Sequence, residues 1–318
     1  MSVICIGEAL IDFVCVEPVR GKEGGLYVKK AGGAPANVAA AISLLGGESY
    51  FAGALGEDSF GEYLASTMQD AGVHLTFLQR VSSPTTLAFV TLQSDGDREF
   101  EFLRGADADY KLESDACLSI AQSSIVHFGS ATAFLDGNLL NTYLTVAGYA
   151  AESGNIISFD PNYRVNLWGN DQPEFKRWCH HMLDLANLVK VSEEELALLT
   201  QASSIEEGCK ALHKMGVEYV FVTLGAKGCL VSIKGQQVLV PAFHINAIDT
   251  TGAGDAFIGA LLYSLDQCND VAMLGMNEWQ DKVAFAQKVS AMVCVKNGAM
   301  NALPTLDEVS SVELAVAH

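Results

Sequence analysis

The sequence predicts an α/β fold with a mostly parallel central sheet. Short runs rich in β-branched residues alternate with helical patterns along most of the 318 residues. Several of these runs are apolar throughout, as expected for parallel strands that helices cover on both faces. Half of the residues are hydrophobic, so the chain can build a large core. No internal repeat or linker interrupts the pattern, which predicts a single domain over 1–318.

The core strands are expected at 2–7, 49–54, 124–129, 155–160, 188–191, 219–224 and 229–233. Helices are expected at 36–45, 59–70, 138–152, 172–185, 193–199, 206–215, 254–265 and 281–295. Gly46 and Gly72 follow the first two helices, where glycine commonly ends a helix.

Two segments interrupt the alternation, at about 12–31 and 85–105. The first holds β-like runs at 13–16 and 26–29 around a turn rich in glycine and charge. The second is typical of a hairpin, with arms at 86–93 and 98–104 and Asp95-Gly96 in the turn. We expect these pieces to form a small antiparallel sheet that acts as a lid over the main sheet. Exposed strand edges invite pairing, so a homodimer through the lid is a further hypothesis.

Composition excludes several classes of protein. The net charge of −19 argues against nucleic acid as a partner, because phosphate neutralisation needs clustered Lys and Arg. The eight cysteines form no CxxC pair, which favours reduced thiols and a cytoplasmic protein. Glu8 and Asp12 interrupt the apolar N-terminal run, so no signal peptide is expected. No apolar run approaches the ~20 residues of a membrane-spanning helix, so no membrane association is expected.

The most informative segment is Asp249-Thr250-Thr251-Gly252-Ala253-Gly254-Asp255-Ala256-Phe257. Its glycines let backbone N–H groups converge on one point, and a helical pattern starts there. A helix start adds free N–H donors and the positive end of its dipole, which together suit a phosphate. Asp255 beside such a site would accept a proton from a nucleophile that attacks phosphorus. The alternative is an ordinary loop in which Asp255 caps the helix.

Polar groups in two other segments extend this interpretation. Gly32-Gly33 allows a ligand to approach the backbone, and Asn37 with Asp12 offers paired polar groups for a polyol. The alternative interpretation of this segment is a glycine-rich turn with a helix cap. Arg164, after the strand at 155–160, either clamps a phosphoryl group or forms a surface salt bridge.

Two further strand ends suit a nucleotide. Glu195 either organises Mg²⁺ through its waters near a triphosphate or complements a helix dipole. Thr223 to Gly228 ends a strand with two glycines on which a nucleotide could lie. Gly21-Lys22 is followed by Glu23, so no Walker A loop exists. The segment after Gly252 also lacks the GxGxxG spacing of dinucleotide-binding proteins.

Taken together, these motifs resemble those of the ribokinase-like (phosphofructokinase-B type) carbohydrate kinases. The resemblance runs from Gly7-Glu8 to Asn297-Gly298-Ala299. It implies a ribokinase-like three-layer α/β/α fold with a small β-sheet lid, and transfer of the γ-phosphate of ATP to a sugar. ATP and Mg²⁺ are the implied cofactors, with K⁺ as a further expectation.

The resemblance also assigns roles to residues. Asp255 matches the catalytic base, and Gly252, Ala253 and Gly254 match the anion hole. Sugar contacts are expected at Asp12, Gly32, Gly33, Asn37, Arg104 and Arg164. Nucleotide contacts are expected at Lys190, Glu195, Thr223, Gly225, Gly228, Gly254, Asn297 and Gly298. Asp249 and Thr251 match ligands of a monovalent cation, and Glu195 matches a water-mediated ligand of Mg²⁺.

Within the family the chain is most similar to fructokinases, through segments such as 84–90, 95–100 and 160–164. Fructose is therefore the expected substrate, phosphorylated on O6 or O1. Two departures concern Ser192, where the family usually has Asn, and Gly105, where fructokinases often have proline after the lid arginine. The alternatives are a kinase of 2-keto-3-deoxygluconate or ribose, and a non-catalytic sugar-binding regulator.

Overall fold

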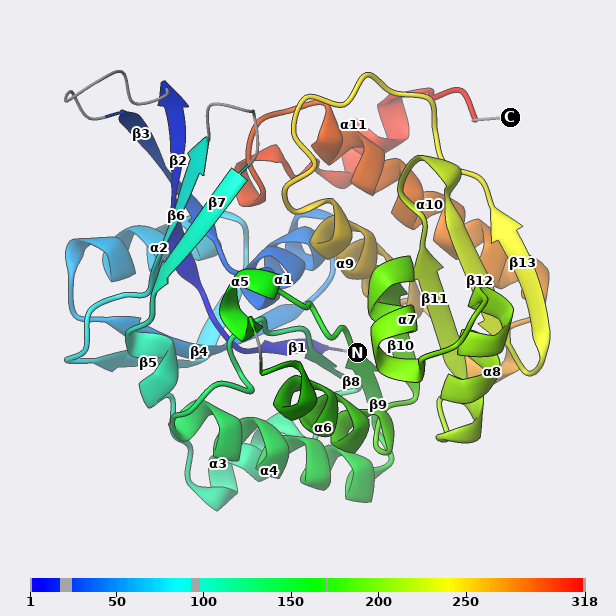
Figure 1. Cartoon of the computed structure of the whole chain (residues 1–318), viewed down its shortest axis with the longest axis horizontal. Helices are drawn as coiled ribbons and strands as arrows, with labels where there is room; N and C mark the ends of the chain where they lie inside the picture. Colours follow the sequence, from blue (N-terminus) through cyan, green and yellow to red (C-terminus); the bar gives the residue numbers. More distant parts are fainter. Residues whose placement is uncertain (1, 18–24, 93–97, 170, 317–318) are drawn as a thin grey trace.

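The computed structural model describes residues 2–17, 25–92, 98–169 and 171–316. Its central sheet has nine strands in the order β13-β12-β11-β10-β9-β8-β1-β4-β5 (Figure 1). They are β1 (Val3–Ile6), β4 (Ser49–Gly56), β5 (His74–Val81), β8 (Ile125–Phe128), β9 (Ile156–Phe159), β10 (Leu188–Ser192), β11 (Tyr219–Thr223), β12 (Cys229–Ile233) and β13 (Gln236–Val240). Neighbouring strands pair in parallel, except that β12 is antiparallel to β11 and β13. The expected, mostly parallel central sheet is confirmed.

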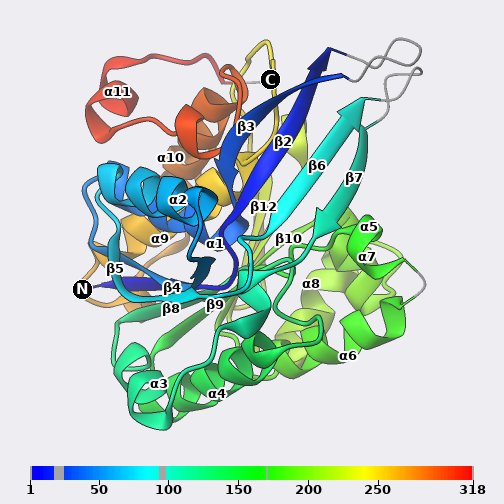
Figure 2. The same ribbon diagram turned by 90° about the vertical axis from the view of Figure 1, so that its left-hand side faces the viewer.

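Helices cover both faces of this sheet, which gives three layers. One face carries α1 (Ala34–Leu44), α2 (Ser59–Asp70), α9 (Ala253–Asp266), α10 (Met276–Cys294) and α11 (Leu306–Ser311). The other carries α3 (Ser114–Ile120), α4 (Asn138–Ser153), α6 (Gln172–Leu183), α7 (Glu193–Thr200) and α8 (Ile205–Lys214). Side chains of β1 point alternately to the two faces of the sheet. Val3 and Cys5 pack into the core on one face, and Ile4 and Ile6 pack into the core on the other. Figure 2 shows α2 and α10 on one side of the sheet, and α3 and α4 on the other.

The expected core strands and helices are all present, with small shifts at their ends. Helix α2 has the expected bounds, whereas α10 begins at Met276 rather than at 281. Strands β5 and β13 and helices α3 and α11 are additional elements that the sequence pattern did not predict.

The small sheet is formed by β2 (Leu10–Glu17), β3 (Leu26–Gly32), β6 (Leu87–Leu92) and β7 (Arg98–Leu103) in the order β3-β2-β6-β7. Its outer pairs are antiparallel, but the central pair of β2 and β6 is parallel. The expectation of a wholly antiparallel sheet was therefore wrong. Each excursion leaves the main sheet in the same direction, so the first strands of the two excursions run side by side. The predicted turn at 94–97 lies outside the described residues.

The small sheet rests on helix α2 (Figure 2). Phe13 of β2 meets Phe60 edge to face with ring centroids 5.7 Å apart, and it stacks on Phe89 of β6 at 5.2 Å. The ammonium of Lys29 lies 3.8 Å from the ring centroid of Tyr63. These contacts fix one face of the small sheet and leave the other face toward the main body.

The chain passes between the two sheets at four places: β1 to β2, β3 to α1, β5 to β6, and β7 to the 3-10 helix η1 (Ala106–Asp109). Buried Glu8 lies in the first of these crossings. Its carboxylate accepts the backbone N–H of Ala34, in the second crossing, and that of Ala131, each at 3.3 Å. It also accepts the hydroxyl of Ser130.

Asp107 joins the other two crossings to the same region. Its fully buried carboxylate accepts the hydroxyl of Thr86, at the start of β6, and Nε of Arg104, just after β7, at 3.0 Å. The hydroxyl of Thr132, 3.5 Å from the Glu8 carboxylate, donates to Asp107 at 2.7 Å. We call Glu8, Thr132 and Asp107 with these partners the hinge cluster. It ties all four crossings together.

The described residues contain no helix that is both long and apolar enough to cross a bilayer. All eight cysteines are free thiols, and only Cys268 is partly exposed.

Candidate active site

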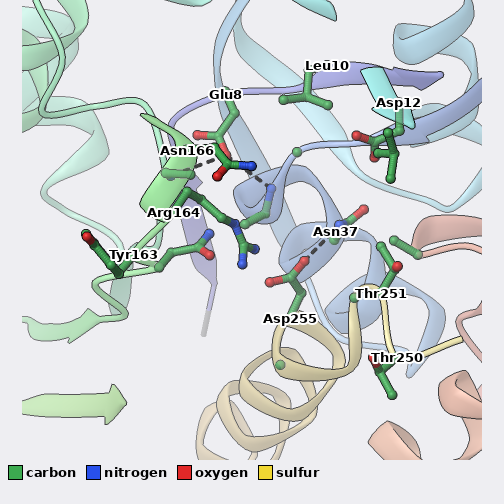
Figure 3. Close-up of a pocket in the computed structure, with 18 of the residues that line it drawn as sticks. Glu8, Leu10, Asp12, Asn37, Tyr163, Arg164, Asn166, Thr250, Thr251 and Asp255 are labelled. Carbon is green, nitrogen blue, oxygen red and sulfur yellow. Dashed lines mark hydrogen bonds between the residues drawn. The ribbon is translucent and has the colours of Figure 1, made fainter. Parts of the chain in front are cut away.

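A cavity of about 600 Å³ lies where the small sheet meets the start of α9 and the carboxyl ends of the central strands (Figure 3). Residues from both ends of the chain line it together. Those expected from the sequence are Asp12, Gly33, Asn37, Arg164, Lys190, Glu195, Asp249, Thr251, Gly252, Gly254, Asp255 and Gly298. Segments far apart in the sequence therefore converge on one hollow.

Asp255 occupies the first turn of α9, and its carboxylate points into this cavity toward Asn37 (Figure 3). The amide Nδ2 of Asn37 donates to Oδ2 of Asp255 at 2.8 Å. Gly252 occupies the N-cap position, and no side chain caps the helix, so the alternative of Asp255 as an ordinary cap is wrong. Burial raises the pKa of Asp255 above 3.8, against the opposing effects of Asn37 and Arg164. Such a shift makes the carboxylate a better proton acceptor.

The backbone around Asp255 presents free donors. The N–H groups of Gly252, Gly254 and Asp255 have no acceptor among the described residues, whereas that of Ala253 donates to the carbonyl of Thr250 at 3.2 Å. Gly252 has a φ of 78°, and a Cβ there would lie 2.7 Å from Cβ of Ala299. Only glycine fits this position, and the resulting turn leaves the N-terminus of α9 open for an anion.

The opposite wall comes from the small sheet. Asp12 on β2 pairs in register with Lys30 on β3, and both face the cavity. Burial raises the pKa of Asp12 to about 6, although Arg164 and Lys30 act to lower it. Oδ1 of Asn37 is buried and has no hydrogen-bond partner among the described residues.

Arg164 reaches the same cavity from the loop after β9, just before the short helix α5 (Val165–Trp168). It forms no ion pair within 4 Å among the residues that the structure describes, so the alternative of a surface salt bridge is not what the structure shows. Its charge instead acts on Asp12 and Asp255.

Asp249 organises the loop before α9. Its carboxylate accepts the backbone N–H and hydroxyl of Thr251, at 3.0 and 2.6 Å, and the N–H of Gly298 at 3.1 Å. Lys30 lies 3.8 Å away. Burial alone would raise the Asp249 pKa, but these hydrogen bonds outweigh burial and lower it, so they favour the charged form of the carboxylate. Groups of three or more His, Cys, Asp or Glu that could hold a metal do not occur among the described residues.

Lys190 on β10 and Glu195, just after this strand, also line the cavity. Glu195 forms a capping box with Ser192 and also accepts the N–H of Tyr163 at 2.8 Å. Lys190 donates to Asp160 at 2.9 Å, and both are almost fully buried. The local hydrogen bonds explain why Glu195 occupies the first turn of α7, and the second lone pairs of its oxygens remain available to a ligand.

Some expected site residues lie outside the cavity lining. Gly32 adjoins Asp12, and Arg104 donates to Asp107 and to the carbonyls of Thr132 and Asp136 in the hinge cluster. On the nucleotide side, Thr223, Gly225, Gly228 and Asn297 lie beyond the lining residues. Packing alone explains why position 228 is glycine, since a Cβ there would lie 2.1 Å from the carbonyl oxygen of Val240.

Sequence reasoning missed other lining residues, among them Glu8, Leu10, Lys30, Val90, Phe102, Asn162 and Asn166. Strand alternation was the available signal for some of them. Leu10 shares one face of β2 with Asp12, and Lys30 shares a face of β3 with Gly32.

Comparison with known proteins agrees with this arrangement. The model of the pfkB family of carbohydrate kinases matches residues 1–306. The chain belongs to the pfkB family of carbohydrate kinases. It is 39% identical to probable fructokinase-4 of Arabidopsis thaliana over 316 residues, which are 98% of this chain and 96% of the relative.

Solved structures give the same result. A fructokinase from Xylella fastidiosa, solved with bound ATP, is 32% identical with a TM-score of 0.86, covering 98% of this chain and 97% of that one. A fructokinase from Vibrio cholerae, solved with fructose, ADP and calcium ion, is 34% identical with a TM-score of 0.83, covering 98% of each chain. A double mutant of the Vibrio protein was solved with potassium ion. The ribokinase-like fold and the assignment as a sugar phosphotransferase are thereby confirmed.

Proposed function

We propose that this protein is a fructokinase, which transfers the γ-phosphate of ATP to O6 or O1 of fructose with Asp255 as general base. The observation that carries the proposal is the position of Asp255. A buried carboxylate, oriented by Asn37, lies beside unpaired N–H donors at the start of α9. A hydroxyl bound there can lose its proton to Asp255 while the amides stabilise charge on the transferred group.

The composition of the cavity favours a neutral sugar. Next to the small sheet it is lined by the acids Glu8 and Asp12 and by apolar Leu10, Val90 and Phe102. Carboxylates accept hydrogen bonds from sugar hydroxyls, but they repel an acidic substrate such as 2-keto-3-deoxygluconate. The bound fructose of the Vibrio relative supports the same choice.

The other expected contacts form part of this proposal. Gly33, Asn37 and Arg164 bind the sugar, and Lys190 and Gly254 face the phosphates of ATP. Thr223, Gly225, Gly228, Asn297 and Gly298 lie toward the nucleoside. Glu194 and Glu195 line the cavity, and their free lone pairs fit Mg²⁺ held through water. Bound Mg²⁺ would neutralise negative charge on the triphosphate. Asp249 and Thr251 offer oxygens for K⁺, which occurs with the Vibrio double mutant. No part of this proposal involves nucleic acid or a membrane.

We further propose that residues 1–318 form one kinase domain in the cytoplasm, whose small sheet is the lid. Its edge strands β3 and β7 have no outer partner among the described residues, and Leu26 and Leu103 are more than half exposed. This edge supports a homodimer through the lid. Light scattering would show a dimer mass, and a monomer at micromolar concentration would reject the dimer.

The decisive experiment is a sugar panel with coupled ADP detection, run on the wild type and on Asp255→Asn. We expect turnover with fructose above that with ribose or 2-keto-3-deoxygluconate. Asparagine keeps the shape but cannot take a proton, so kcat should fall at least ~10²-fold with little change in ATP affinity. Asp266→Asn, at the far end of the same helix, is the matched control and should keep kcat. Near-normal turnover by Asp255→Asn would remove it from the base role, and no ADP release with any sugar would favour a regulator.

A further inference from the structure

The side chain of Lys190 is a buried cation in the wall of the cavity. It projects from core strand β10, is 8% exposed and donates to Oδ2 of Asp160 at 2.9 Å. Lysine is almost never buried unless it is paired. Its Nζ also lies 3.1 Å from the point that a Cβ on Gly254 would occupy. The ammonium therefore lies against the first turn of α9.

Its surroundings keep Lys190 charged. Burial alone would lower its pKa, but the carboxylates of Asp160, Glu195 and Asp255 outweigh burial and raise the pKa. The buried neighbour His127 is neutral, because burial and the charge of Lys190 lower its pKa to about 3. The wall thus carries a permanent positive charge.

This placement is unfavourable for the protein alone. A cation at the N-terminus of a helix opposes the helix dipole. Three N–H groups without acceptors among the described residues, those of Gly252, Gly254 and Asp255, face the same cavity. Two positive features therefore converge on one space, and an anion held there would satisfy both.

Resting on the fructokinase function above, we propose that Lys190 is a further catalytic residue, whose ammonium contacts the phosphoryl group during its transfer. Asp160 holds the ammonium in place before the substrates bind. In the transfer, the sugar oxygen bonds to the γ-phosphorus, the bond from phosphorus to the β–γ bridging oxygen breaks, and ADP leaves with that electron pair. The sugar proton goes to Asp255, and Lys190 keeps its three protons throughout.

The position of Lys190 favours the transferred group over the rest of ATP. It adjoins Gly254 and Asp255, where the sugar hydroxyl and the γ-phosphate meet, whereas Thr223, Gly225 and Gly228 lie outside the cavity lining. An interaction formed mainly with the group in transfer lowers the barrier without tightening ATP binding. We therefore expect an effect on kcat and little effect on the dissociation constant of ATP.

The test compares Lys190→Met, Asp160→Asn and the double variant. Methionine alone leaves Asp160 buried without its cation, so the single variant can fail to fold, whereas the double variant removes both charges. We expect the folded double variant to lose at least ~10²-fold in kcat, with ATP affinity changed less than about threefold. Asp160→Asn keeps the ammonium and should retain more than about a tenth of kcat. Recovery of kcat by the double variant to within about threefold of wild type would overturn the proposal.

A second measurement separates this proposal from the fructokinase function. ADP with aluminium fluoride and fructose mimics the phosphoryl group in transfer, and calorimetry measures its binding. The wild type and Asp255→Asn should bind this mixture more tightly than ADP with fructose, and the double variant should lose at least ~10-fold of that gain. An unchanged gain in the double variant, with an active wild type, overturns the role of Lys190 alone. A wild type that turns over no sugar overturns both.

Discussion

Removing the carboxylate of Asp107 should destabilise the protein more than any nearby surface change. Asp107 is fully buried, carries a formal charge and accepts bonds from Thr86, Thr132 and Arg104. In Asp107→Ala the guanidinium of Arg104 keeps only two backbone carbonyls, the Thr86 hydroxyl loses its acceptor, and the Thr132 hydroxyl keeps only the Glu8 carboxylate at 3.5 Å. We therefore expect loss of a charged partner together with a cavity.

The magnitude follows from the burial. Breaking a buried ion pair by removing one partner costs about 3–5 kcal/mol, whereas an exposed pair contributes about 0–1 kcal/mol. The Arg104 side chain is 19% exposed, so solvent screens it in part, and we take the lower end, about 3 kcal/mol. Asp107→Asn keeps one acceptor oxygen and should lose about half as much.

Urea denaturation monitored by circular dichroism gives the free energy of unfolding. Asp109→Ala is the matched control, because Asp109 lies two residues away and accepts the hydroxyl of Ser83 but is exposed. That variant should change the free energy of unfolding by less than about 1 kcal/mol. Equal losses for Asp107→Ala and Asp109→Ala would refute the reasoning, because burial would then have no effect.

Two further predictions concern the cavity. Gly252→Ala should lower kcat at least ~10-fold, because its φ of 78° and the contact with Ala299 force the first turn of α9 to shift; coupled ADP detection measures this, and unchanged kcat contradicts it. Burial raises the pKa of Glu8 from its usual 4.5 to about 7, so its contribution favours folding below pH 4.5 and is lost as the pH rises through 7. Thermal melts at pH 5 and 8 should show a smaller drop for Glu8→Gln than for wild type, and an equal drop would refute the assignment.

The buried strands and helices could be predicted from the sequence, because a buried element needs apolar residues at a regular spacing. Strand β1 and helix α2 were found from apolar runs and helical spacing. Strand β5 was missed because it is an edge strand with no fully buried residue, so its sequence carries no apolar run. Its pairing with β4 alone defines it.

The site was predicted only in part, for a related reason. Local motifs identified Asp255 and the glycines around it, since a turn and a helix start leave a signature in one segment. The partners of Asp255 and the use of Arg104 in the hinge cluster depend on contacts between distant segments. Asn37 lies 218 residues from Asp255 in the chain, a separation that no short pattern records.

The hinge cluster has a consequence for engineering this enzyme by recombination. Glu8, Thr132 and Asp107 connect all four crossings between the main sheet and the small sheet. The two insertions that form the small sheet must therefore be exchanged together. A chimera that takes only 85–105 from a relative would separate Thr86 and Arg104 from Asp107 and Thr132, which they contact. Functional grafts should therefore carry both insertions, Asp107 and the segment 130–132 from the same parent.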